Sequence, residues 1–268
     1  MVNKTSVSFS LPPISVIIPS LNQGAFIEYT IRSLLDQNYP NLEIIVCDGM
    51  STDTTISILR KWQNYIKWVS ERDSGQSEAI NKGLKWSKGE ILAYLNADDC
   101  LLPGSLSRIA LAFEKNQQAM WLTGQCQIIN THGRRIRFLI EQYKNFFLRY
   151  LPYIKALYIT NYISQPATFW KRSAWERVGD FNPTLRYVMD YDYWIRLWQE
   201  FGPPLIIHQP LASFRIHETS KTTSEGHAMS YVKEEESILQ KHRAPRLFYN
   251  LHRVHRLAMT HIYHWMNS

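Results

Sequence analysis

The sequence has few cysteines and no long apolar run. Its three cysteines, Cys47, Cys100 and Cys126, form no CxxC pair, so a disulfide framework is not expected and a reducing cytoplasm is the simplest location. The first residues, MVNKTSVSFSLPP, lack the apolar core of a signal peptide. No uninterrupted apolar run reaches the length of about 18 residues that predicts a membrane-spanning helix.

Two common nucleotide-binding motifs are also missing. The turn Pro19-Ser20-Leu21-Asn22 lacks the GxGxxG fingerprint, which disfavours an NAD site. No GxxxxGK[ST] sequence occurs, which disfavours a P-loop. The stretch PSLNQGAF has one glycine and no basic residue. This argues against a nucleotidyltransferase, the first alternative enzyme class, because such enzymes need a loop rich in Gly and Lys or Arg to hold a triphosphate.

The composition is that of a globular protein with a sizeable core. The chain has 268 residues, of which 45% are hydrophobic and 20% charged. The net charge is +7, and basic residues gather in the tail between Lys241 and Arg256. A solvated basic helix, a non-catalytic module that binds nucleic acid or lipid, and a contact with an anionic membrane all remain open for this tail.

The first half alternates between two hydrophobic patterns. Strands are predicted at 14–22, 42–49, 66–73 and 90–99, and helices at 25–37, 51–62, 74–89 and 103–116. This alternation predicts a parallel sheet with helices on both faces. In the second half, we expect a hairpin over 121–138, strands over 165–172 and 205–217, and a helix over 190–202, whereas residues 138–164 show no clean period.

Carboxylates follow three of the predicted strands. They are Asp48, Asp73 and the pair Asp98-Asp99, and ligands bind outside the carboxyl ends of such strands. The adjacent pair can share a divalent cation, and Mg²⁺ takes its other ligands from phosphates and water. The pattern therefore predicts a diphosphate ligand. Residues 51–53 can cap the following helix, which leaves Asp48 free for a ligand.

Five stretches stand in the order seen in family 2 glycosyltransferases. They are SVIIPSLNQ, IIVCDGMSTDTT, SERDSGQSEAINKG, KGEILAYLNADDCLLPG and MDYDYWIRL. The chain resembles this family over residues 12–220. The resemblance implies the GT-A fold, an α/β fold with a Rossmann-like, mostly parallel sheet and a less regular C-terminal portion. We expect an extension at 1–11, the GT-A domain at 12–222 and a helical basic tail at 223–268.

The resemblance also implies roles for individual residues. The donor nucleotide would be held by Pro19, Ser20, Asn22, Asp48, Asp73, Gly75, Asn81 and Asp98. Asp98 and Asp99 resemble the DXD metal motif, with Asp99 as the firmer ligand of Mg²⁺ or Mn²⁺ and Asp98 shared between metal and ribose. His217 matches a histidine that follows the last strand in many relatives, and two roles stay open for it: a ligand of the metal or the diphosphate, or a structural side chain. Arg215 and Lys221 either neutralise phosphates or are surface charges.

Asp190 resembles the catalytic base of the family. Many members have Glu-Asp here, whereas this chain has Met189-Asp190. Asp190 lies one turn before Trp194 at a predicted helix N-terminus, where the helix dipole favours the carboxylate and an apolar surround raises its pKa. Asp192 is the rival candidate, but a capping or surface role is expected for it because it lies off the apolar stripe.

The function implied is inverting glycosyl transfer by a single displacement, with a metal to assist the leaving diphosphate. The donor would be a nucleotide-diphosphate sugar, of the UDP or dTDP type because Asp48 suits an imide N–H. The acceptor would be a glycan or a lipid-linked sugar in polysaccharide or glycolipid assembly. Residues 138–164 and the basic tail could rest on the inner face of a membrane, and no nucleic-acid partner is expected.

Overall fold

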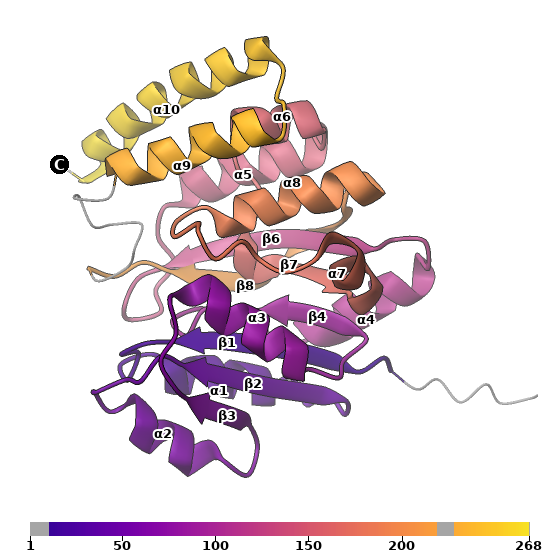
Figure 1. Ribbon diagram of the computed structural model, residues 1–268, viewed down its shortest axis with the longest axis vertical. Coiled ribbons are helices and arrows are strands. Elements are labelled where there is room, and N and C mark those ends of the chain that lie inside the picture. The colour runs from indigo at the N-terminus through magenta and orange to yellow at the C-terminus, as the bar shows by residue number, and fades with distance from the viewer. Residues whose placement is uncertain (1–10, 219–227, 268) are drawn as a thin grey trace, which may run out of the picture.

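The computed structural model describes residues 11–218 and 228–267, so Lys221 and the first ten residues lie outside the described part (Figure 1). Eight strands form one sheet in the order β3-β2-β1-β4-β7-β6-β8-β5. The strands are β1 (Ile14–Ser20), β2 (Leu42–Asp48), β3 (Lys67–Ser70), β4 (Ile91–Tyr94), β5 (Cys100–Leu101), β6 (Trp121–Ile129), β7 (Thr168–Lys171) and β8 (Leu205–Arg215).

The first half of the chain confirms the predicted alternation of strands and helices. Strands β1 to β4 are parallel to one another. The helices between and after them are α1 (Ile27–Leu35), α2 (Thr55–Trp62), α3 (Gln76–Trp86) and α4 (Ser105–Lys115). Strand β7 is antiparallel to both of its neighbours, β4 and β6, and β8 runs parallel to β6. The sheet is therefore mixed beyond β4.

Both faces of the sheet are buried, which explains why β1 reads as a continuous apolar run. Val16 and Ile18 belong to one core cluster, with Ile31 of α1. Ile17 points to the other face and packs in a second cluster with Leu84 of α3. Successive strand side chains alternate between faces, so a strand covered on both sides must be apolar throughout.

One expectation for the second half is wrong, and residues 138–164, for which no element was predicted, prove to be helical. No return strand of a hairpin follows β6: only Ile129 and Arg135 form an isolated bridge, because β7 and β8 already pair with β6 on its two sides. Residues 138–164 contain two helices, α5 (Phe138–Tyr150) and α6 (Ile154–Ile159). Their period was hidden because α5 exposes large apolar side chains such as Leu139 and Phe146 on the face away from the core.

The remaining helices are α7 (Arg172–Val178), α8 (Met189–Phe201), α9 (Ala228–Lys241) and α10 (Arg246–Asn267). Of these, α9 and α10 lie at the top of Figure 1, α8 lies between them and the sheet, and α7 lies beside β7. Helix α8 buries Trp194, which stacks on Trp121 of β6 with ring centroids 6.1 Å apart. Helix α9 adds Ile238 and Leu239 to the same core cluster. Among the helices that the structure describes, none is long and apolar enough to span a membrane.

Candidate active site

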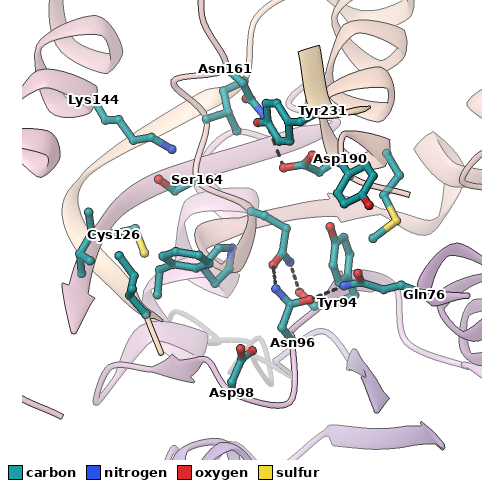
Figure 2. Close-up of a pocket in the computed structure, with 18 of the residues that line it drawn as sticks. Gln76, Tyr94, Asn96, Asp98, Cys126, Lys144, Asn161, Ser164, Asp190 and Tyr231 are labelled. Carbon is teal, nitrogen blue, oxygen red and sulfur yellow. Dashed lines mark hydrogen bonds between the residues drawn. The ribbon is translucent and has the colours of Figure 1, made fainter. Parts of the chain in front are cut away.

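A cavity of about 840 Å³ opens at the carboxyl ends of β1, β3, β4 and β8 (Figure 2). Parallel strands place the residues that follow them at one edge of the sheet, which is where this cavity lies. Seven of the predicted site residues line it: Pro19, Ser20, Asp73, Gly75, Asp98, Asp190 and His217. The other four, Asn22, Asp48, Asn81 and Asp99, do not line it.

Asp98 and His217 meet at the floor of the cavity. Asp98 follows β4, His217 follows β8, and the Asp98 Oδ2 and His217 Nε2 atoms are 2.9 Å apart. The imidazole also packs against Phe26, with ring centroids 4.5 Å apart. Packing on a ring fixes the plane of the imidazole, so the pair presents one oxygen and one nitrogen ligand to the cavity in a defined orientation.

Asp99 does not meet the expectation that it is the firmer metal ligand. Its side chain is fully buried, and its oxygens accept hydrogen bonds from the backbone N–H of Arg215 at 2.8 Å and from Asn96 Nδ2 at 3.1 Å. Burial, together with the charge of Asp98, raises the pKa of Asp99 well above its usual value. Of the two carboxylates, Asp98 lines the cavity (Figure 2) and Asp99 does not.

Asn96 was missed from the sequence, although it comes two residues before Asp98. Its amide is held on both sides, because Oδ1 accepts from Gln76 Nε2 at 2.6 Å and Nδ2 donates to Gln165 Oε1 at 3.2 Å. Gln165 in turn donates to the Tyr94 carbonyl at 2.7 Å. Figure 2 shows this chain of amides across the cavity wall. It fixes the loop that carries Asp98.

Asp190 lies in the first turn of α8, as predicted, and its carboxylate faces the cavity (Figure 2). Oδ1 accepts from the Tyr191 N–H at 2.8 Å, and Oδ2 accepts from Asn161 Nδ2 at 3.4 Å. Burial raises the pKa of Asp190, while the Tyr191 N–H and the charge of Lys144 oppose that rise. Met189, which stands where many family members have glutamate, also lines the cavity, and its sulfur accepts a hydrogen bond from the Ser77 hydroxyl of α3.

Asp192, the rival base, is buried, so the expected surface or capping role is wrong. It forms ion pairs with Arg196 at 2.9 Å and Lys241 at 2.9 Å, and a hydrogen bond with His242 Nε2 at 2.8 Å. The burial alone would raise its pKa, but the hydrogen bond from His242 and the charges of Arg196 and Lys241 hold the pKa well below its usual value. Asp192 ties α8 to the end of α9 and lies outside the cavity lining.

Asn22 follows β1 and Asp48 ends β2, and neither lines the cavity. The Asn22 backbone is left-handed, with φ of 53°, and Asn22 Oδ1 accepts from the Thr52 N–H at 2.9 Å. Asp48 was expected to be free, but it accepts hydrogen bonds from the Ser51 N–H at 2.9 Å and from the Ser70 hydroxyl at 2.7 Å. Both side chains therefore connect loops instead of lining the cavity.

The side chains of Asn81 and Arg215 likewise form hydrogen bonds with backbone groups of the protein. The Asn81 amide forms a pair of 2.8 Å hydrogen bonds with the backbone N–H and carbonyl of Phe181. The buried Arg215 guanidinium donates to the carbonyls of Asp98 at 2.8 Å and Asn130 at 3.0 Å. Arg215 is absent from the cavity lining, so the structure does not place it where it could neutralise a phosphate.

Comparisons with known proteins identify the family. Residues 15–179, more than half of the chain, match glycosyl transferase family 2. The chain belongs to this family. An uncharacterized glycosyltransferase of Haemophilus influenzae is 26% identical over 231 residues, which span 82% of this chain and 76% of the relative. The Escherichia coli chondroitin synthase is 26% identical over 72% of this chain, which spans only 27% of that protein. The protein is thus a glycosyltransferase.

Solved structures of similar shape agree on the fold. Staphylococcus aureus TarS 1–349 in complex with UDP-GlcNAc has a TM-score of 0.63 and 18% identity, covering 85% of this chain and 66% of that one. The mannosyltransferase PcManGT of Pyrobaculum calidifontis, in complex with GDP-Man and Mn²⁺, has a TM-score of 0.62 and 19% identity. The match covers 87% of this chain and 65% of that one. The fold is GT-A. Asp190 and His217 lie beyond residue 179, so their roles depend on the geometry above.

Proposed function

We propose that this glycosyltransferase moves a sugar from a nucleotide-diphosphate sugar, of the UDP or dTDP type, to an acceptor hydroxyl with inversion. The observation that carries the proposal is that one cavity holds both the Asp98–His217 pair and the Asp190 carboxylate (Figure 2). A donor diphosphate needs a cation site, and an acceptor hydroxyl needs a base. The cavity offers a candidate for each.

The floor of the cavity fits a divalent cation. Asp98 Oδ2 and His217 Nε2, 2.9 Å apart, would hold it, since carboxylate and imidazole are both ligands of first-row divalent metals. Across the described ranges, no group of three or more His, Cys, Asp or Glu side chains is placed to hold a metal. Diphosphate and water would complete the coordination, as is usual for Mg²⁺. Once bound, the cation supplies positive charge against the leaving diphosphate.

Asp190 supplies the base. The Tyr191 N–H and the Asn161 amide orient its carboxylate, which accepts the proton of the acceptor hydroxyl. The acceptor oxygen then attacks the anomeric carbon from the face opposite the diphosphate, and a single displacement inverts the configuration. Burial raises the pKa of Asp190, and a more basic carboxylate accepts a proton more readily, provided that the pH keeps it ionised.

The relatives support the class of donor and acceptor. The TarS structure is a complex with UDP-GlcNAc, and the PcManGT structure is a complex with GDP-Man and Mn²⁺. Chondroitin synthase and a putative teichuronic acid biosynthesis glycosyltransferase of Bacillus subtilis are among the related sequences. A glycan or lipid-linked acceptor in polysaccharide or glycolipid assembly is therefore the acceptor class we propose.

A cytoplasmic enzyme with such an acceptor would benefit from contact with the inner face of a membrane, and α5 and α10 offer a surface for it. Tyr143 of α5 bonds to His255 of α10 at 2.6 Å, so the helices are neighbours. Leu139 is 70% exposed and Leu257 67% exposed. Apolar side chains beside basic residues suit an anionic lipid surface.

Anionic vesicles should carry the protein upward in a flotation gradient, and the double variant Leu139→Asp, Leu257→Asp should stay below. Flotation of that variant would refute the contact.

A thermal-shift panel of sugar nucleotides tests the proposed function. With Mn²⁺ present, one donor should raise the melting temperature, because a ligand that binds only the folded state stabilises it. EDTA should abolish the shift. The variant Asp190→Asn should keep the shift and lose transfer. The donor assignment fails if no sugar nucleotide stabilises the protein in Mn²⁺, and the base assignment fails if Asp190→Asn transfers sugar at the normal rate.

A further inference from the structure

Lys144 of α5 reaches into the cavity at some distance from Asp98. Figure 2 shows its ammonium pointing inward from one side, with Asp190 on the other side and Asp98 at the far end. In the part of the chain that the structure describes, its ammonium has no hydrogen bond and no ion pair. Glu141, one turn earlier, is already used, because it accepts from the Ile128 N–H at 2.6 Å and from Arg135 Nε at 2.8 Å.

Lys144 is half-buried in the wall of the cavity. Burial lowers the pKa of Lys144, and the charge of Asp190 only partly opposes this. A partly desolvated ammonium gains more from an anionic partner than a fully hydrated one does. A negatively charged ligand group would supply the missing partner. Lys144 is also separated from Asp98 in Figure 2, so a donor diphosphate bound at Asp98 does not account for it.

A second polar group in the same part of the cavity lacks a partner. Asn161 donates its Nδ2 to Asp190 at 3.4 Å, and its Oδ1 is buried with no hydrogen bond. Buried amide oxygens are nearly always satisfied. Asn161 lines the cavity, so a hydroxyl of a bound sugar could donate to this oxygen while a neighbouring hydroxyl meets Asp190.

We propose that Lys144 and Asn161 form the acceptor subsite, in which Lys144 binds a negatively charged group of the acceptor, a carboxylate or a phosphate. The acceptor would thus be an acidic sugar or a sugar attached to a phosphate. The proposal rests on the proposed function, because Asp190 marks the place of the reacting hydroxyl. Asn161 would bind a second hydroxyl and set the angle at which the acceptor approaches Asp190.

Binding of small probes to the enzyme loaded with UDP and Mn²⁺ tests the subsite, since the loaded donor site cannot capture a phosphate. The probes are methyl β-glucuronide, its neutral analogue methyl β-glucoside, and a short-chain prenyl diphosphate sugar, each followed by saturation-transfer NMR. The variants are Lys144→Met, Lys144→Arg and the control Lys155→Met. Lys155 is an exposed lysine of α6 that does not line the cavity.

At least one anionic probe should bind the wild-type enzyme about tenfold tighter than the glucoside, as expected for a charge-assisted hydrogen bond. The glucuronide would identify a carboxylate and the prenyl probe a phosphate. Lys144→Met should lose this preference, while Lys144→Arg and Lys155→Met keep it. The subsite is refuted if neither anionic probe binds, if the three probes bind alike, or if Lys144→Met keeps the preference.

The same samples separate this proposal from the proposed function. Stabilisation of Lys144→Met by the donor with Mn²⁺ should equal that of the wild type, because Lys144 lies away from Asp98. If the donor shift is normal and the probe preference is absent in the wild type, only the acceptor subsite fails. If no donor stabilises any of the proteins, the proposed function fails first.

Discussion

Replacing Asp192 with asparagine should destabilise the protein and leave the chemistry in place. The Asp192 side chain is fully buried, and its two oxygens contact nitrogen atoms of three side chains, Arg196, Lys241 and His242. Two of these partners belong to the C-terminal end of α9 and the residue after it. The substitution removes the negative charge to which all three are directed. It therefore weakens the attachment of α9 to α8.

The size of the effect follows from what the partners lose. Removing one member of a buried ion pair costs about 3–5 kcal/mol, because the other charge stays buried and unpaired. Here Arg196 keeps its bonds to the carbonyls of Val178 and Asp180 at 2.7 and 2.9 Å. The Lys241 side chain is 51% exposed and can be hydrated. We therefore expect the lower end, about 3 kcal/mol, for Asp192→Asn.

Urea unfolding at neutral pH measures this loss, and Asp190→Asn is the matched control in the same helix. Burial disfavours the charged form of Asp190. Replacing it with the neutral asparagine should therefore leave the urea midpoint of unfolding unchanged or raise it slightly. Asp192→Asn should lower the midpoint by about 1 M and still transfer sugar when folded. The reasoning is refuted if both variants unfold at the wild-type midpoint, or if Asp190→Asn is the less stable of the two.

Three further predictions concern the site. The value of kcat/KM should fall as the pH decreases, because only the ionised form of Asp190 accepts a proton. Burial raises the pKa of Asp190, so the pH-rate profile should give an apparent pKa above that of an ordinary aspartate. An apparent pKa equal to that of an ordinary aspartate would contradict this prediction. Asp98→Asn should lower donor affinity in Mn²⁺ by tenfold or more, whereas the same change at Asp99, which does not line the cavity, should lower donor affinity much less, and calorimetric titration of the two variants distinguishes them. Asn81→Ala should cost about 2 kcal/mol, because it leaves the N–H and carbonyl of Phe181 without their partner, and urea unfolding at the wild-type midpoint would show otherwise.

The first half of the fold was predictable because each of its strands and helices has one clear hydrophobic period. Strand β1 is covered on both faces and reads as a continuous apolar run, and α1 buries Ile27, Ile31 and Leu34 at helical spacing. Helix α5 was not predictable. It buries Ile140 and Leu148 but also exposes Leu139 and Phe146, so apolar residues occur on both of its faces.

The sequence could predict which residues line the cavity where their place at the end of a strand puts them there. It could not do so where the direction of the side chain decides whether a residue lines the cavity. Asp73 and Asp98 line the cavity because they follow β3 and β4. The sequence could not show that Asp48 is already bound by Ser51 and Ser70. Lys144 lies in the segment 138–164, which has no clear period and also contains Arg149 and Lys155, so the sequence alone could not single it out.

The geometry also explains how two adjacent carboxylates are tolerated after β4. Asp99 turns into the protein and accepts the backbone N–H of Arg215 at 2.8 Å, while the Arg215 side chain returns to the Asp98 carbonyl at 2.8 Å. These two bonds fix the end of β8 against the loop after β4. His217 comes two residues later, and this attachment places its Nε2 beside Asp98. Asp99 would thus serve the proposed cation site by positioning His217, and the two carboxylates need not share a ligand.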